Sequence, residues 1–154
     1  MRPALAPLAL VVVLAPACAI EPQSGTWNFK NRQVVTNTCN VDIADGDFEL
    51  DNNDDGTFTV DPNDGGERFD CTLEKDDAFS CPDRLQTTIT APGVDAVIAF
   101  NVRVSGTFES ETEAEGTQRG VGVCAGSACD LAALLLGVTF PCETVATFDA
   151  TYAE

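Results

Sequence analysis

The sequence has 154 residues, a formal net charge of −17 and no histidine. A charge this negative repels phosphate backbones and anionic lipid headgroups, which argues against nucleic-acid binding and against electrostatic docking to membranes. Without histidine the chain lacks the usual general base and the commonest zinc ligand, and no nucleophile–base pair can be assembled, so we expect no enzymatic activity.

Residues 1–17 have the pattern of a secretory signal peptide. Arg2 supplies a positive charge, an uncharged and largely apolar run extends from Ala4 to Leu14, and small residues precede Cys18. The apolar run is too short to span a bilayer as a permanent anchor. The sequence therefore predicts export, and an oxidising compartment for the cysteines that follow.

The four residues that end at Cys18, APAC, resemble the lipobox of bacterial lipoproteins. In that family a lipid is attached to the cysteine thiol, and cleavage makes the cysteine the new N-terminus. The resemblance implies a fatty-acylated Cys18 and attachment to a membrane through that lipid. Because Ala19 is not an aspartate retention signal for the inner membrane, it also implies the outer membrane or the cell surface. The alternative is an ordinary A-x-A cleavage site, which would give a secreted or periplasmic protein.

We expect a short polar tether over residues 18–24 and a single β-domain over residues 25–154. Runs of alternating apolar and polar residues are separated by Gly, Pro, Asn and Asp, the pattern of an antiparallel all-β protein. About eight strands are expected, enough to close a small barrel, with a sandwich as the alternative. The runs lie near residues 27–35, 47–51, 58–60, 69–73, 79–81, 85–89, 98–108, 119–123 and 145–152.

Two segments differ from this alternation. Residues 109–116 are acidic and polar and are expected to form a mobile loop. Residues 130–137 have no alternation, begin with a suitable N-cap in Asp130 and end at Gly137, which predicts a helix of two turns. We expect its leucines to pack over one end of the sheet. Insertion into a membrane is the alternative, although the helix is too short to span one.

Setting Cys18 aside leaves six cysteines, an even number that suits disulfides. Their spacing favours three pairs: Cys71–Cys81 across one hairpin, Cys124–Cys129 around a short flexible loop, and Cys39–Cys142 between the early and the late chain. The main alternative pairs Cys124 with Cys142. Zinc thiolates are disfavoured because the chain lacks histidine and oxidation is expected.

The stretch Asp51-x-Asn53-x-Asp55-Gly56 matches the first half of an EF-hand calcium loop. Position twelve of that loop is Pro62 instead of a bidentate glutamate. A hairpin turn rich in Asp and Asn has the same residues for conformational reasons alone. A secreted, calcium-binding β-protein therefore remains an alternative, and calcium is the one cofactor that the sequence brings into view.

The triplet Gly25-Thr26-Trp27 resembles the G-x-W opening of the lipocalin barrels. In that family the Trp plugs the closed end, so the resemblance implies a barrel in preference to a sandwich. A barrel of this type would bind a small apolar ligand in an interior lined by Trp27, Phe100, Val102, Phe108 and Phe148. The alternative is a filled interior and a purely structural or interaction role.

Overall fold

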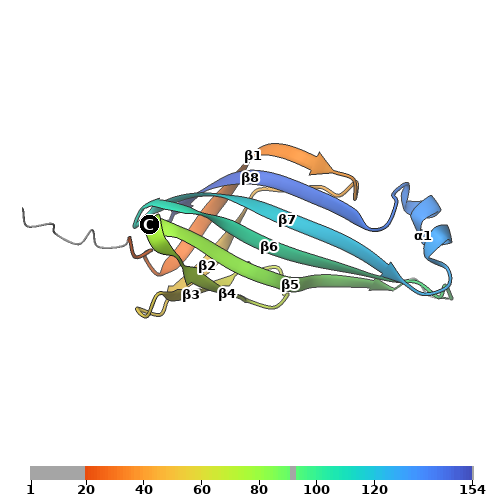
Figure 1. Cartoon of the computed structure of the whole chain (residues 1–154), viewed down its shortest axis with the longest axis horizontal. Helices are drawn as coiled ribbons and strands as arrows, with labels where there is room; N and C mark the ends of the chain where they lie inside the picture. The colour runs from red at the N-terminus through yellow and green to blue at the C-terminus, as the bar shows by residue number, and fades with distance from the viewer. Residues whose placement is uncertain (1–19, 91–92, 154) are drawn as a thin grey trace, which may run out of the picture.

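Each strand pairs with the next in the sequence, and the last pairs with the first, which closes the sheet into an antiparallel barrel (Figure 1). The runs expected near residues 79–81 and 85–89 belong to one strand. The computed structural model describes residues 20–90 and 93–153, so the signal segment 1–17 and Cys18 lie outside the described residues. Within the described ranges there are eight strands, a 3-10 turn and one α-helix: β1 (Gly25–Asn37), β2 (Gly46–Asn52), β3 (Thr57–Asp61), β4 (Phe69–Leu73), η1 (Lys75–Asp77), β5 (Ala78–Thr90), β6 (Val97–Ser110), β7 (Glu113–Ala125), α1 (Cys129–Leu136) and β8 (Cys142–Tyr152). The all-β prediction is confirmed.

The alternation of side chains along the strands separates the barrel interior from solvent. In β6, Val102 and Phe108 are buried inside the barrel, whereas Arg103 and Glu109 are exposed outside it. β6 pairs with β7 along almost its whole length, from Val97 to Ser110. A slip of one residue would turn the apolar side chains outward, so burial fixes this register.

The prediction of a mobile loop over residues 109–116 is wrong. β6 continues to Ser110 and β7 begins at Glu113, so only two residues turn between them. The acidic side chains alternate with small inward residues, which is the period of a strand. Gly116 must be small, because an added Cβ would lie 2.6 Å from the ring of Phe148.

Among the described residues, the three disulfides are the pairs that the spacing favours: Cys39–Cys142, Cys71–Cys81 and Cys124–Cys129. Cys71 and Cys81 join β4 to β5 inside the barrel, with their Cα atoms 4.2 Å apart. Cys124–Cys129 ties the end of β7 to the first turn of α1. Three such bonds indicate an oxidising, exported environment.

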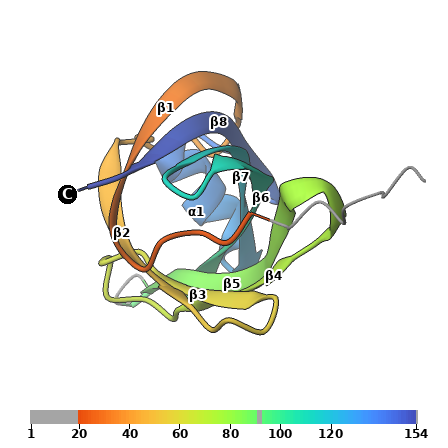
Figure 2. The same cartoon turned by 90° about the vertical axis from the view of Figure 1, so that its left-hand side faces the viewer.

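Residues 20–24, expected as a polar tether, fold across one end of the barrel (Figure 2). Pro22 is among the most buried side chains, and Ile20 packs against the core. The backbone N–H of Ile20 donates to Asp77, and that of Gln23 donates to the carbonyl of Glu111. We call residues 20–24 the plug segment, because it covers the end of the barrel that we refer to as the closed end.

The strands have unequal lengths, so the two ends of the barrel differ. β5, β6 and β7 have 13, 14 and 13 residues, whereas β3 and β4 have 5 each. The long strands extend beyond the short ones to the end that carries α1 (Figure 1). There Ala96 and Ile98 pack against Ala132 of the helix in a second, smaller core.

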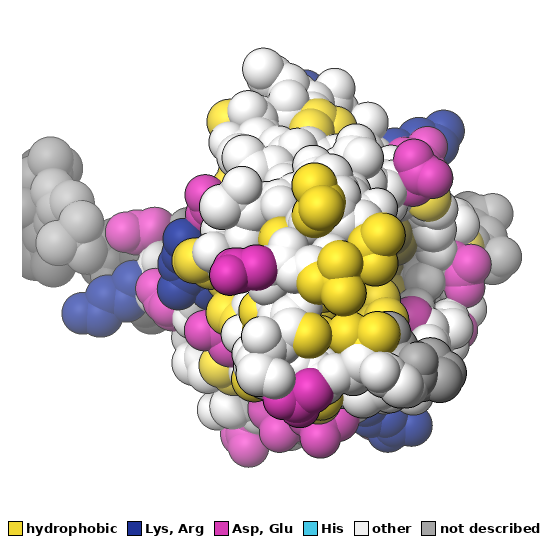
Figure 3. Space-filling model, turned by 90° about the vertical axis from the view of Figure 1, so that its right-hand side faces the viewer, with side chains coloured by type: hydrophobic (Ala, Val, Ile, Leu, Met, Phe, Trp, Pro, Cys, Tyr) yellow, Lys and Arg dark blue, Asp and Glu magenta, His cyan; other side chains and the backbone are white. Residues whose placement is uncertain are grey.

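The helix has the predicted position and length, but the expectation that its leucines pack in the core is wrong. Ala132 is the buried residue of α1, whereas Leu134 and Leu135 are 77% and 73% exposed. An apolar patch is visible at this end of the molecule (Figure 3). The helix covers the second core with its small side chains, because Ala132 allows a close approach to the sheet.

Candidate functional site

Aromatic rings fill the closed end of the barrel. Phe108 lies among them, and the centroid of its ring is 4.9 Å from that of Phe79, 5.6 Å from Phe58 and 6.0 Å from Trp27. Edge-to-face and tilted pairs of this kind stabilise by about 0.5–1.5 kcal/mol beyond the area that they bury. The cluster therefore forms a rigid floor for the space next to it.

Trp27 lies between this floor and the plug segment. Its side chain is fully buried, and its indole N–H donates to the carbonyl oxygen of Gln23 at 2.9 Å. A buried N–H needs such a partner, so the plug segment satisfies Trp27 while it covers it. The sequence thus closes this end of the barrel with residues that precede the first strand.

Next to the floor the barrel encloses a cavity of about 190 Å³, which we call the inner chamber. Trp27, Phe108 and Phe148, all expected to line a ligand cavity, are in its wall. Ala114 and Ala150 also line it, and their small side chains leave the space open.

Phe100 and Val102, the other two residues expected at the cavity, line a second space of about 540 Å³, the outer chamber. Residues 41–45, between β1 and β2, and the first two residues of β2 form one wall of this chamber. The two chambers adjoin, because they share four lining residues: Phe29, Pro62, Gln86 and Gln118. The five residues predicted for one cavity are therefore divided between two adjoining spaces.

The chamber sizes limit what can bind. An engineered apolar cavity of about 150 Å³ is known to hold benzene. The inner chamber is slightly larger, so it accommodates a molecule with a single ring or a short chain. Barrels of eight strands are of the size that holds one small ligand. The outer chamber provides room for a longer substituent.

Two charged residues, Asp64 and Arg84, belong to the wall of the inner chamber, and Arg84 is the buried one. β5 has two bulges against β6, between Cys81 and Arg84 and between Leu85 and Thr87. A bulge adds a residue to one strand and reverses the face that later side chains occupy. Arg84 therefore points inward and is 6% exposed, whereas Leu85 points outward and is 41% exposed.

The guanidinium of Arg84 is held on two sides. Nη2 donates to Oδ2 of Asp64 at 2.6 Å, and Cζ lies 4.5 Å from the centroid of the Phe69 ring. Gly66 lies against it, since an added Cβ would be 2.4 Å from Nη1. Nε and Nη1 are buried, and neither has a hydrogen-bond partner among the described residues.

The contact with Arg84 helps to lower the pKa of the Asp64 carboxyl. Burial raises the pKa of its carboxyl, but the hydrogen bonds from Arg84 and from the Gly66 N–H, together with the charge of Arg84, outweigh burial. The pKa of Asp64 therefore lies below its ordinary value, and its carboxyl is ionised at neutral pH.

Sequence alternation could not reveal Arg84. The run Leu85, Thr87 and Ile89 indicates a strand, but it gives no reason to bury the preceding arginine. The signal that was available is Pro82, because proline inside a sheet is confined to edges and bulges. A bulge at this position makes the facing of the next residues uncertain from the sequence alone.

Two of the three residues expected as calcium ligands, Asn53 and Asp55, form hydrogen bonds within the turn between β2 and β3. Asp51 lies in β2, and Asn53 and Asp55 lie in the turn that follows. Asn53 Nδ2 donates to the hydroxyl of Thr57, and Asp55 Oδ1 accepts hydrogen bonds from the N–H and the hydroxyl of the same residue. Within the described part of the chain, no group of three His, Cys, Asp or Glu side chains is placed to hold a metal ion.

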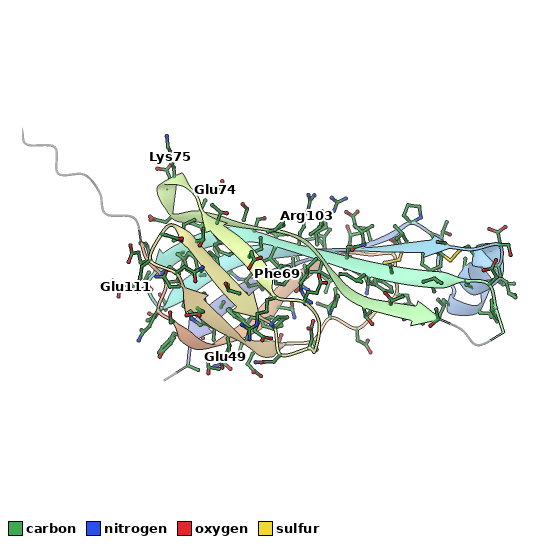
Figure 4. All side chains as sticks on the ribbon, turned by 90° about the horizontal axis from the view of Figure 1, so that it is seen from below. Glu49, Phe69, Glu74, Lys75, Arg103 and Glu111 are labelled. Atoms are coloured by element: carbon green, nitrogen blue, oxygen red, sulfur yellow. A yellow bond between two sulfur atoms is a disulfide. The ribbon has the colours of Figure 1, made fainter. Side chains whose placement is uncertain are left out.

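Charged side chains cover the outside of the barrel. On that face Arg32 forms ion pairs with Glu115 at 3.2 Å and with Asp149 at 3.1 Å. The labelled side chains of Lys75 and Arg103 project outward, whereas Phe69 lies among the strands (Figure 4). The polar chemistry of the interior is thus concentrated at Arg84.

Over residues 20–90 and 93–153, no helix has the length and apolar character needed to cross a membrane. Cys18, the expected lipidation residue, is outside this range. Comparisons of the chain with protein-family models, with curated proteins and with solved structures find no match.

Proposed function

We propose that the protein is an exported, lipid-anchored envelope or surface protein whose barrel binds a small apolar ligand without catalysing a reaction. The observation that carries this proposal is the inner chamber, an apolar space of about 190 Å³ beside Trp27. Concave, mostly apolar pockets with a few polar groups are the usual form of small-molecule sites. The resemblance of residues 25–27 to the opening of the lipocalins agrees with a carrier role.

Fluorescence of Trp27, the only tryptophan in the sequence, offers a direct test. Bromobenzene fits the inner chamber by size, and its heavy atom quenches indole fluorescence on contact. We expect saturable quenching with a dissociation constant on the order of 0.1–1 mM.

Two variants of β7 provide the controls. Ala114→Leu places a larger side chain in the inner chamber and should abolish the quenching, whereas Ala125→Leu makes the same change at an exposed position and should leave it intact. Quenching that is not saturable, or that survives Ala114→Leu, would indicate a filled interior and a structural or interaction role.

The lipid anchor is a separate part of the proposal. It rests on the lipobox-like residues that end at Cys18. Ala19 alone separates Cys18 from Ile20, whose N–H is bonded to Asp77, so an anchored protein would hold its closed end close to the membrane. Intact mass of protein purified from its native membrane should show diacylglycerol and a fatty acyl group on Cys18. An unmodified N-terminus near residue 18, with the protein in the soluble fraction, would contradict it.

A further inference from the structure

Arg84 is a buried charged residue in the wall of the inner chamber, which is lined mainly by apolar side chains. Its side chain is 5% exposed, and Nε and Nη1 are buried without a partner in the described part of the chain. Buried polar groups are nearly always hydrogen-bonded, and leaving a charged donor without a partner is costly. A ligand that offers an acceptor to these atoms would gain more than a purely apolar one.

Asp64 determines which kind of acceptor fits. Its carboxylate already neutralises Arg84 through a contact of 2.6 Å, and its side chain is 27% exposed. A second carboxylate would place two anions around one guanidinium, in a protein whose net charge is −17. It would also lose its own hydration on entering the chamber. A neutral carbonyl oxygen accepts the same hydrogen bonds without either cost.

The remaining polar groups of the inner chamber agree with a neutral ligand. Besides Asp64 and Arg84, the polar side chains in its wall are Gln86 and Gln118, which are uncharged. Both also line the outer chamber. The two glutamines thus lie where the chambers meet, whereas Arg84 and Asp64 line the inner chamber alone.

We propose that the barrel selects small apolar ligands that carry one neutral carbonyl oxygen, as in a ketone, aldehyde or ester, and that this oxygen accepts hydrogen bonds from Arg84. This inference rests on the proposed function, because it assigns a chemical class to the ligand of the same cavity. Arg84 is then a specificity residue, and Asp64 is the group that excludes anions.

Three probes of similar size test it with the wild-type protein: toluene, acetophenone and benzoate, each competing with bromobenzene for quenching of Trp27. We expect acetophenone to bind at least about tenfold more tightly than toluene, the gain from a hydrogen bond to a charged donor, and benzoate to bind more weakly than acetophenone. Equal affinity for toluene and acetophenone would overturn the proposal while the carrier function stood. Tighter binding of benzoate than of acetophenone would contradict the proposal that the ligand is neutral. Failure of all probes, bromobenzene included, would refute the carrier function itself.

Two variants test whether Arg84 causes the preference for acetophenone over toluene. Arg84→Met combined with Asp64→Asn removes both charges together, so no unpaired ion remains in the wall. This double variant should lose the preference for acetophenone but bind toluene within about twofold of the wild type. Arg103→Met, on the outer face, is the matched control and should keep the preference. A preference that persists in the double variant would assign the selectivity to another group.

If the double variant does not fold, an NMR measurement on the wild-type protein still tests the role of Arg84. The buried Nε–H of Arg84 should give a ¹⁵N–¹H signal that shifts on addition of acetophenone and stays in place with toluene. The same response to both compounds would overturn the role of Arg84.

Discussion

The two ends of the barrel are built by different means. At the closed end, Trp27, Phe58 and Phe108 pack in a continuous aromatic core within a sheet that has no free edge. At the α1 end, where the long strands extend beyond the short ones, the core consists of a few small residues around Ile98. Two of the three disulfides, Cys39–Cys142 and Cys124–Cys129, fasten this end.

The difference shows how a chain of this size divides its stabilisation. Where the barrel closes, large buried side chains surround the Cys71–Cys81 bond, and this core is rigid enough to hold a cavity open. Where the sheet projects beyond the closed part, little apolar surface can be buried, and covalent bonds restrain the chain instead. Loss of Cys39–Cys142 or Cys124–Cys129 should therefore affect mainly the α1 end, and loss of an aromatic ring mainly the closed end.

The largest expected effect comes from the bridge with the longest loop. Removing Cys39–Cys142 by replacing both residues with Ala should cost about 4–5 kcal/mol of unfolding free energy, because the bond closes 103 residues. The same change at Cys124–Cys129, which closes a loop of only 5 residues, should lower the unfolding free energy by about 2 kcal/mol. Urea denaturation measures both. The reverse order would show that unfolded-chain entropy does not govern these bonds.

A matched pair of phenylalanines compares the two cores. Phe108→Ala should cost about 3–5 kcal/mol, because Phe108 is 3% exposed at the closed end. Phe140→Ala, at the partly buried residue that packs beside α1, should cost about 1–2 kcal/mol. Equal losses in thermal or urea unfolding would remove the distinction between the two ends.

The ion pair in the cavity wall should respond to acid. Because the pKa of Asp64 is lowered in the folded protein, its contribution is complete above the unfolded value of about 3.9 and is lost as pH falls through the folded value. Asp64→Asn should cost about 2 kcal/mol at pH 7, between the values for exposed and fully buried pairs. The difference from wild type should shrink below about pH 4. A difference that does not change between pH 7 and pH 3 would contradict the assignment.

The smallest effect is expected on the exposed face of α1. Leu134→Ser and Leu135→Ser should each change the unfolding free energy by less than about 0.5 kcal/mol, because both side chains are in solvent. Ala132→Leu, on the buried face of the same helix, should cost about 1–3 kcal/mol through overpacking. A large loss at Leu135 would mean that the leucines are covered in the native protein.

The fold could be predicted from the sequence because its strands keep a regular period. The runs around Phe48, Phe58 and Phe108 place one apolar face on each strand, and turn residues mark most boundaries. The loop expected over residues 109–116 is instead strand, because its acidic side chains alternate with small inward ones. Its small residues Ala114 and Gly116 occupy inward positions, and a side chain at Gly116 would collide with Phe148.

The cavity could be predicted only in part. Trp27, Phe108 and Phe148 follow from alternation, because each lies on a regular stretch of strand. Arg84 does not, because a pair of bulges that the sequence does not specify determines its direction. The division into two chambers likewise depends on three-dimensional packing between strands far apart in the chain.

A crystal of the protein soaked in bromobenzene would test the central claim most directly. The anomalous signal of bromine should lie in the inner chamber, within the wall formed by Trp27, Phe108 and Phe148. An absence of bromine from that chamber, or a signal confined to the exposed leucines of α1, would contradict a ligand-binding barrel.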